Sequence, residues 1–337
     1  MGGMVYNSID ATKLTTAEVY GRALCELAEE HPEVVALTAD LAKSTKTSVF
    51  AKQFPERLIN VGIAENNMFG IAAGMAKEGF VPYASTFSIF ACARSLDQIH
   101  SNIAYQNIPV KIIGTHAGTS FGQAGSTHHC LIDLAVIKSL PNMTIFCPCD
   151  GAEAYYAVKS SYEDVKGPCY ISINRGFDAI VNKSLDDVNW QWDKATVMRE
   201  GTALTIIAVG CEVSEALQAA RMLESDCGLK TRVLNMHTIK PIDKEAILKA
   251  VEETGVIVTA EDRVTQGGMG SAVAEVIAAS GKACKFKMLG HDNSFSTIGL
   301  QEDLLEIAGI DANGIEKAVL DLMGIDGEDA FDWTDEI

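Results

Sequence analysis

Glu65 is a candidate for proton chemistry because of where it stands in the chain. An apolar stretch, residues 58–61, predicts a strand, and Gly62 turns the chain toward a helix rich in glycine and alanine. A carboxylate in the first turn of a helix stabilises its positive end whatever else it does. The small residues of 70–76 also predict that another segment packs closely on this helix, for example across a subunit interface. Residue type and position alone favour a structural role for Glu65 and leave a catalytic role open.

Two further candidates, His116 and His128, stand in one glycine-rich stretch, residues 114–129. An apolar run that predicts a strand precedes it, and its four glycines predict a surface loop. Histidine changes charge near neutral pH, so two of them in such a loop favour a role toward a ligand. A metal site is disfavoured, because no carboxylate or cysteine stands at a fitting offset.

Other conspicuous residues favour structure over chemistry. Phe87 and Phe90 are three residues apart, which predicts one face of a helical turn within an ordinary core. Residues 267–270, Gly-Gly-Met-Gly, lack both the Lys-Ser/Thr of a phosphate loop and the spacing of a dinucleotide loop. They predict a tight turn that opens a helix. The sequence Cys147-Pro-Cys149 has no second ligand pair, so no zinc or other metal site is expected.

The elements that must position these residues alternate between short apolar strands and helices. A capping box at residues 15–18 predicts the start of the first helix. The strands predicted in the first half are 34–38, 58–61, 81–84, 110–115, 144–146 and 170–173. This alternation is typical of a mostly parallel sheet covered on both faces. Ligands gather at the carboxyl ends of such strands, so chemistry is expected in the loops after Thr38, Val61 and Thr115.

A polar stretch, residues 177–201, has no clear periodicity and interrupts this alternation. A second alternating series begins at Leu204, and helices are predicted near 300–308 and 314–322. We therefore predict an α/β protein with two doubly wound domains. The first, residues 1–180, is built on a mostly parallel sheet; a linker, 181–200, joins it to the smaller domain 201–337.

Composition narrows the classes of partner. The chain of 337 residues has a formal net charge of −18, which repels nucleic acid and anionic lipid. No apolar run is long enough to cross a membrane and no signal peptide is visible, so a cytoplasmic protein is expected. The nine cysteines show no regular framework and predict reduced, mostly buried thiols. The acidic run Asp326–Glu336 predicts a solvated chain end.

Several segments in order resemble one family. The pyrimidine-binding domain of transketolases is similar to ALTADLAKS, LINVGIAENN, PYASTFSIF, GTHAGTSFGQAGSTHH, LPNMTIFCPCD and ISINRG. The C-terminal domain of transketolases is similar to TALTIIAVGCEVSEAL, LKTRVLNMHTIKPID and VIVTAEDRVTQGGMGSAVAE. The resemblance covers residues 14–322, and the order and spacing of the segments make it specific. It implies a thiamine-pyrimidine-binding domain followed by a transketolase C-terminal domain.

The resemblance implies a thiamine diphosphate enzyme, in which the cofactor stabilises a carbanion as an electron sink. Glu65 matches the glutamate that controls the tautomer of the cofactor's pyrimidine ring. Phe87 and Phe90 match the aromatic residues that stack on or flank this ring, and Asp40 matches a carboxylate near the thiazolium ring. The implied cofactors are thiamine diphosphate and Mg²⁺.

The resemblance also implies sugar substrates. His116 and His128 match residues that bind donor and acceptor hydroxyls or relay protons, so both are implied to be catalytic. Ser44 and Arg175 match contacts to the sugar phosphate. The implied reaction is the transfer of a two-carbon ketol unit from a ketose, or its phosphate, to an aldose, or its phosphate.

Three positions depart from the family pattern. An acidic pair is expected in the loop where residues 123–128 read Gln-Ala-Gly-Ser-Thr-His. An arginine of the phosphate site is expected where Thr16 and Ala17 stand, and Ala93 replaces a frequent tyrosine. Because these changes remove a hydroxyl partner and a guanidinium, the ordinary pentose phosphates are expected to be poor substrates.

A missing motif points to a partner chain. No Gly-Asp-Gly followed after about 25 residues by an Asn pair is present, although the family uses this motif for the metal and diphosphate. The only similar run, residues 324–327, has no helix after it. The resemblance therefore implies a separate N-terminal transketolase subunit that holds Mg²⁺ and the diphosphate. It implies a heterotetramer built on a homodimer of this chain.

Three alternatives remain open. The β-subunit of a 2-oxo-acid dehydrogenase has the same two domains, but the Thr-His pairs and the segment HTIKPID fit the transketolase branch better. A condensing enzyme similar to deoxyxylulose-phosphate synthase is the second. The third is a catalytically silent regulatory subunit, against which the presence of Glu65 and both histidines argues.

Overall fold

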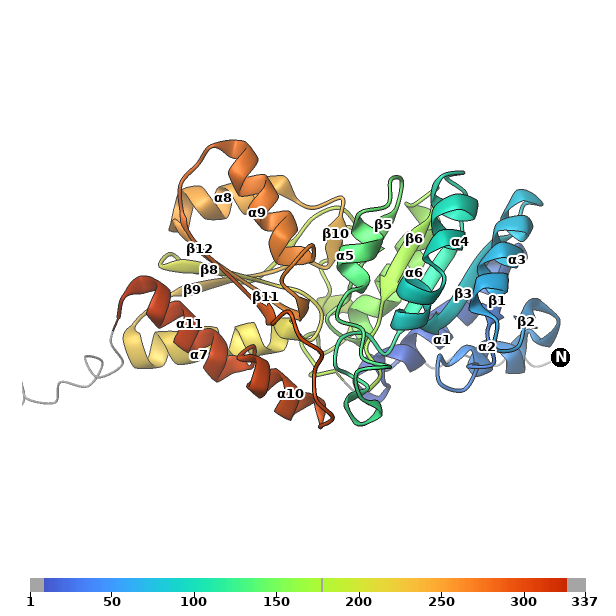
Figure 1. The fold of residues 1–337 in the computed structure, drawn as a ribbon, viewed down its shortest axis with the longest axis horizontal. Helices are drawn as coiled ribbons and strands as arrows, with labels where there is room; N and C mark the ends of the chain where they lie inside the picture. Colours follow the sequence, from blue (N-terminus) through green and yellow to red (C-terminus); the bar gives the residue numbers. More distant parts are fainter. Residues whose placement is uncertain (1–8, 177, 326–337) are drawn as a thin grey trace, which may run out of the picture.

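The computed structural model describes residues 9–176 and 178–325, and the acidic run Asp326–Glu336 lies outside them. The chain forms two β-sheets flanked by helices, one of seven strands and one of five (Figure 1). The first sheet has the strand order β10-β5-β6-β4-β3-β1-β2 and the second β12-β11-β8-β9-β7. The fold class predicted from the sequence, two mostly parallel α/β sheets, is confirmed.

The first sheet is parallel except for one edge strand. Its strands are β1 (Val34–Thr38), β2 (Leu58–Asn60), β3 (Val81–Phe87), β4 (Lys111–Thr115), β5 (Thr144–Phe146), β6 (Cys169–Ser172) and β10 (Thr238–Lys240). Only β10 runs antiparallel, against β5. Because the other six are parallel, their carboxyl ends share one edge, at which the predicted functional loops begin.

Side chains of β1 point alternately to the two faces of this sheet, and helices pack against them on both faces. Val35 and Leu37 belong to one buried cluster, and Val34 and Ala36 belong to the other, as the two-residue period of a strand requires. The first cluster includes α3 (Glu65–Lys77), α5 (Asp133–Lys138) and the π-helical turn Ile99–Ala104. The second includes α1 (Thr16–Glu30), α2 (Thr47–Gln53) and α6 (Gly151–Glu163). The predicted capping box of α1 is present, with Thr15 and Glu18 each bonded to the other's backbone.

The second sheet repeats this plan on a smaller scale. Its strands are β7 (Thr196–Arg199), β8 (Leu204–Ala208), β9 (Thr231–Asn235), β11 (Val256–Val264) and β12 (Lys285–His291). They are parallel except for β7, which runs against β9. The accompanying helices are α7 (Glu212–Cys227), α8 (Lys244–Thr254), α9 (Met269–Ser280), α10 (Gln301–Ala308) and α11 (Ala312–Met323). The predicted turn at 267–270 does open a helix, α9.

Two features differ from the pattern read from the sequence. The single helix predicted over residues 90–105 is instead a π-helical turn, Phe90–Arg94, then α4 (Leu96–Gln98), then a second π-helical turn. Strands also cross the predicted domain limits, since β7 lies within the proposed linker and β10 joins the first sheet. Apolar periodicity does not reveal either feature, because π turns and edge strands depend on their neighbours in space.

Candidate active site

The predicted site residues follow the carboxyl ends of neighbouring parallel strands. Along the sheet edge the order is Arg175 after β6, His116 after β4, Phe87 at the end of β3, Asp40 after β1 and Glu65 after β2. These five positions are separated by up to 135 residues in sequence, but the strand order places them in one row. This row is the candidate active site.

At the centre of the row five rings form an aromatic cluster: Phe87, Phe90, His116, Phe121 and His128. The ring centroids of Phe87 and His116 are 4.0 Å apart, and those of Phe87 and Phe90 are 5.5 Å apart and stacked. Phe121 meets His116 at 4.8 Å and His128 at 5.6 Å. Phe87 and Phe90 therefore do not form the predicted face of a helical turn within the core. Phe87 ends a strand, and Phe90 begins a π-helical turn and stays half-exposed.

His116 is held neutral by its surroundings. Its side chain is buried, and its backbone adopts φ 59°, a conformation that costs a non-glycine residue about 1–3 kcal/mol and that concentrates at functional sites. Burial, followed by the positive charge of Arg175, lowers the pKa of His116 to about 3. Nδ1 lies 3.0 Å from the hydroxyl of Thr115. At neutral pH His116 is therefore a neutral hydrogen-bonding group and not a cation.

His128 lies on the more open side of the aromatic cluster. It is half-buried, and its Nδ1 is 3.0 Å from the Thr127 hydroxyl. Phe121, which the sequence analysis overlooked, packs between the two histidines. A large aromatic residue in a loop with many glycines was the signal for it, because such a loop has little core of its own to fill.

Glu65 begins α3 and is almost fully buried, with 2% of its surface exposed. Its carboxylate accepts a hydrogen bond from Arg94 Nη1 at 2.8 Å. The guanidinium carbon of Arg94 also lies 4.1 Å from the centre of the Phe90 ring. Arg94 thus connects Glu65 to the aromatic cluster. Sequence reasoning missed it, although its spacing of four residues from Phe90 was a usable signal.

Asp40 and Ser44 lie in the loop after β1. Asp40 is exposed, and its hydrogen bonds run to Asn60 and not to the aromatic cluster. Asn60 Oδ1 accepts from the backbone N–H of Asp40 at 2.9 Å and of Gly62 at 3.0 Å. Asn60 therefore couples the Asp40 loop to the turn before Glu65. Ser44 is half-buried further along the same loop.

Arg175 is the exposed cation of the row. Its guanidinium carbon lies 4.8 Å from the centre of the Phe121 ring, and its backbone N–H donates to Ser120 Oγ at 3.2 Å. Stacking holds the planar guanidinium against the loop while its N–H groups stay open to solvent. Such a group can bind an anionic substituent of a ligand.

The departures from the family pattern are visible in the structure. Thr16 is buried in α1 and donates its hydroxyl to Asp178, whose pKa burial raises to about 6. Residues 122–124 form a 3₁₀ turn, in which Gln123 is exposed. Neither place carries a guanidinium or the expected acidic pair. Within residues 9–176 and 178–325, no cluster of three His, Cys, Asp or Glu side chains could hold a metal ion.

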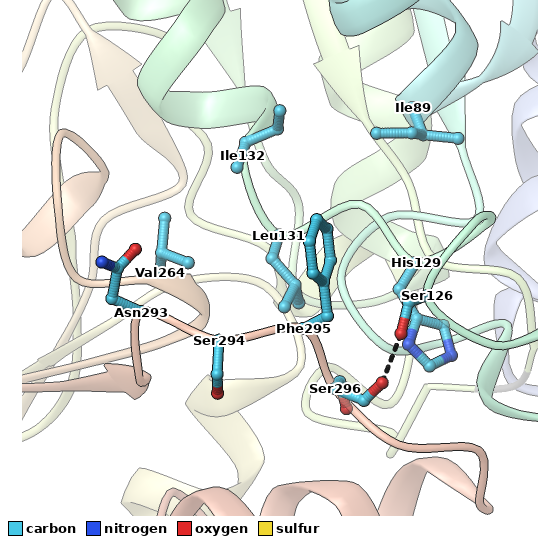
Figure 2. A pocket seen from close by; sticks show the side chains of 10 residues that line it. All are labelled: Ile89, Ser126, His129, Leu131, Ile132, Val264, Asn293, Ser294, Phe295 and Ser296. Atoms are coloured by element: carbon cyan, nitrogen blue, oxygen red, sulfur yellow. Dashed lines mark hydrogen bonds between the residues drawn. The ribbon is translucent and has the colours of Figure 1, made fainter.

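A cavity of about 240 Å³ adjoins the glycine-rich loop (Figure 2). Its walls combine Ser126, His129 and Ile132 with a segment after β12 that carries Phe295. Ser126 donates its hydroxyl to the carbonyl of Ser296. The C-terminal half of the chain thus forms part of the surroundings of the site. Across the part of the chain that the structure describes, no helix is long and apolar enough to span a membrane.

Comparison with known protein families agrees with this geometry. Residues 12–177 match the transketolase pyrimidine-binding domain, and residues 193–315 match the transketolase C-terminal domain. A solved structure described as a split gene transketolase, in an inactive β4 tetramer, superimposes with a TM-score of 0.83 and 40% identity. The match covers 93% of this chain and 99% of that one.

Curated relatives extend this likeness. A protein of Methanocaldococcus jannaschii named as a transketolase C-terminal section is 39% identical over 90% of this chain and 95% of its own length. An apulose-4-phosphate transketolase subunit from Phocaeicola vulgatus is 37% identical over 89% and 95%. A 1-deoxy-D-xylulose-5-phosphate synthase of Geobacter sulfurreducens is also 37% identical, but the match spans 47% of that protein. The chain therefore belongs to the transketolase family and corresponds to its pyrimidine-binding and C-terminal domains.

Proposed function

We propose that this chain is the pyrimidine-binding subunit of a thiamine-diphosphate-dependent transketolase that transfers a two-carbon ketol unit between sugars. The observation that carries the proposal is a buried carboxylate, Glu65, which Arg94 connects to a stacked aromatic pair at the carboxyl edge of a parallel sheet. Thiamine diphosphate, when bound, supplies the nucleophilic carbon and the electron sink of such a reaction.

Glu65 and the aromatic pair fit the aminopyrimidine end of this cofactor. A planar ring with hydrogen-bonding nitrogens needs a flat apolar surface and a carboxyl partner, and Phe90 and Glu65 supply them. Arg94 already makes both kinds of contact with its own planar group, which supports the fit of a flat, polar ring at this place. In the proposed reaction Glu65 holds or returns a proton at the pyrimidine nitrogen.

The two histidines are proposed to act on the sugar. His116 is neutral and rigidly packed, so it orients a hydroxyl by hydrogen bonding. His128 is more open and can move a proton to or from a hydroxyl during the transfer. Arg175 and Ser44 are proposed to contact a phosphate or another anionic end of the substrate, and Asp40 to lie near the thiazolium ring.

A separate chain is proposed to complete the site. The sequence lacks the Gly-Asp-Gly motif with its following Asn pair, which supports a partner subunit that holds Mg²⁺ and the diphosphate. The related split gene transketolase is described as an inactive β4 tetramer, which supports self-association of this type of chain without activity. The proposed active form is a heterotetramer in which two copies of this chain pair with two partner subunits.

Calorimetry and kinetics test the proposal together. The chain alone is expected to bind thiamine diphosphate weakly, and the complex with its co-purified partner to bind it with Mg²⁺. Tight, magnesium-dependent binding by the chain alone would contradict the split site.

A panel of free and phosphorylated ketoses with aldose acceptors then identifies the reaction. We expect ketol transfer, with kcat/KM for xylulose 5-phosphate and ribose 5-phosphate below about 10⁴ M⁻¹s⁻¹ because of the substitutions at Ala124 and Thr16–Ala17. Turnover of pyruvate with glyceraldehyde 3-phosphate instead would favour the synthase reaction.

A further inference from the structure

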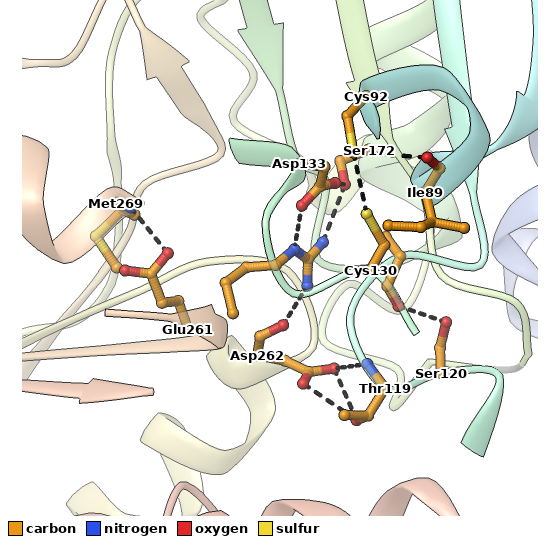
Figure 3. A network of polar contacts seen from close by, with 12 residues as sticks. Ile89, Cys92, Thr119, Ser120, Cys130, Asp133, Ser172, Glu261, Asp262 and Met269 are labelled. Carbon is orange, nitrogen blue, oxygen red and sulfur yellow. Dashed lines mark hydrogen bonds and ion pairs between the residues drawn. The ribbon is translucent and has the colours of Figure 1, made fainter. Parts of the chain in front are cut away.

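Asp262 of β11 reaches from the second sheet into the loop of the candidate active site. Its carboxylate is 99% buried and accepts the backbone N–H of Thr119 at 2.9 Å and the Thr119 hydroxyl at 3.0 and 3.1 Å (Figure 3). His291 Nε2 lies 2.8 Å from Oδ1 of the same carboxylate. Hydrogen bonds to a charged acceptor are among the stronger ones in proteins.

The contact falls within the glycine-rich loop, which carries three rings of the aromatic cluster, those of His116, Phe121 and His128. Thr119 stands between His116 and Phe121, and its neighbour Gly118 has φ +58°. A Cβ atom at Gly118 would lie 2.2 Å from Asp262 Oδ2, so the loop approaches the carboxylate as closely as only glycine permits. The loop and the carboxylate are therefore fitted to each other.

Gly118 also closes the loop on itself. Its N–H donates to the carbonyl of Cys130 at 3.0 Å, and the Cys130 N–H returns a bond of 2.9 Å. His128 stands two residues before this closure. Fixing residues 118–119 consequently fixes both arms of the loop, one with His116 and one with His128.

The residue after Asp262 anchors the same strand to the first sheet. Arg263 Nε lies 2.6 Å from Asp133 Oδ1, and both side chains are buried. Asp133 also accepts hydrogen bonds from Tyr170 and Ser172 of β6. The end of β11 is thereby held at a defined place beside the site, which gives Asp262 a rigid base.

We infer that Asp262 is a positioning residue, through which the C-terminal domain sets the loop geometry of His116, Phe121 and His128. Its hydrogen bonds to the glycine-rich loop all run to Thr119, and through them it is inferred to act. The inference rests on the proposed function for its kinetic consequence, whereas its structural consequence can be measured without any substrate.

Amide hydrogen exchange on the purified chain gives the first test. Asp262→Asn keeps the size of the side chain but loses the charge, and exchange in residues 117–130 is expected to speed up by about tenfold or more. Peptides from α1 and β1 should keep their protection. Asp292→Asn, the same change at an exposed neighbour of His291, is the matched control and should leave the loop unchanged.

The second test approaches the contact from the loop and covers the case in which Asp262→Asn does not fold. Thr119→Val removes the hydroxyl while keeping the branched shape, and Thr119→Ser restores the hydroxyl. Faster loop exchange is expected for Thr119→Val, with recovery in Thr119→Ser.

In the complex with the partner subunit, Asp262→Asn or Thr119→Val should lower kcat by about tenfold or more, the scale of a misplaced catalytic group, while calorimetry shows an unchanged Kd for thiamine diphosphate. Loop exchange equal to wild type in both variants overturns the inference. Faster exchange with unchanged kinetics also overturns it, because Asp262 is then only structural. If the wild-type complex shows no ketol transfer, the proposed function fails, and the exchange rates alone decide whether Asp262 sets the loop.

Discussion

Glu65 follows the carboxyl end of β2 in the first sheet, and Glu261 lies near the carboxyl end of β11 in the second. Both carboxylates are almost fully buried. The carboxyl ends of the strands are called the first edge and the second edge below. Glu65 has a half-exposed arginine as its partner. Glu261 lies within β11 and accepts the backbone N–H groups of Met269 and Gly270 at 2.8 and 2.7 Å. Those N–H groups at the start of α9 have no acceptor within the helix, so the Glu261 carboxylate caps the helix.

The neighbours of these residues extend the contrast. On the first edge, His128 and Phe90 are half-exposed and Arg175 is exposed. On the second edge, Asp262 binds Thr119 and Arg263 binds Asp133, whereas Glu212 is completely buried with no hydrogen-bond partner for its Oε2. Both edges follow the rule that polar residues collect at the carboxyl ends of parallel strands. The three side chains named on the first edge remain accessible to solvent, whereas those named on the second edge are buried within the chain.

The largest expected effect is on the second edge. Arg263→Met leaves the buried Asp133 carboxylate without its cation, which should lower the free energy of unfolding by about 3–5 kcal/mol. Denaturant unfolding of the purified chain measures it. Arg221→Met, at an exposed arginine, is the control and should stay within about 0.5 kcal/mol of wild type. Equal stability of the two variants would show that the second edge is not structural.

Glu65→Gln should separate the two edges by function. The amide keeps the shape of the side chain but cannot share an acidic proton, so turnover of the complex should fall by about 10²-fold or more. Subunit association, measured by sedimentation, should survive. Glu261→Gln in the same complex should leave the turnover of folded protein within a few-fold of wild type. A similar loss of turnover in both variants would contradict a catalytic role for Glu65 and a structural role for Glu261.

The stability of the folded chain is expected to depend on pH through Glu261. Burial raises the pKa of Glu261 from its ordinary 4.5 to about 7 in the folded chain. The folded state therefore binds a proton more tightly than the unfolded state. The resulting stability, about 3 kcal/mol, is present below pH 4.5 and is lost as the pH rises through about 7.

Unfolding curves from pH 4.5 to 8 for wild type and Glu261→Gln measure this effect. The difference in unfolding free energy between the two proteins should shift in favour of the variant as the pH increases. Glu275→Gln, on the exposed surface of α9, should follow wild type at every pH. A constant difference between wild type and Glu261→Gln would contradict the raised pKa.

The smallest effect is expected from a substitution at the first edge. Arg175→Met should raise KM for phosphorylated substrates by about tenfold, since one charged hydrogen-bonding partner is lost, with little change for free sugars. Stability should be unchanged, because the side chain is exposed. Arg199→Met, remote from the edge on β7, serves as the kinetic control. An equal rise in KM for free and phosphorylated sugars would argue against a phosphate contact.

The alternation of strands and helices, the capping box of α1 and the glycine-rich loop can all be predicted from the amino-acid sequence alone. Each of these follows from residues close together in the chain, whose periodicity and turn chemistry are local properties. Residue type and loop context favoured a ligand-facing role for His116 and His128, and the family resemblance added Glu65 and the aromatic pair as site residues. The strand order of the first sheet then placed them along one edge.

The interaction partners of these residues depend on the tertiary structure. Arg94 stacks on Phe90 and pairs with Glu65 because a π-helical turn, invisible to apolar periodicity, brings it there. Asp262 meets Thr119 across 143 residues of sequence. Such a contact depends on how two sheets pack, and packing is set by the shapes of many side chains at once. No pattern within a short window of sequence contains that information.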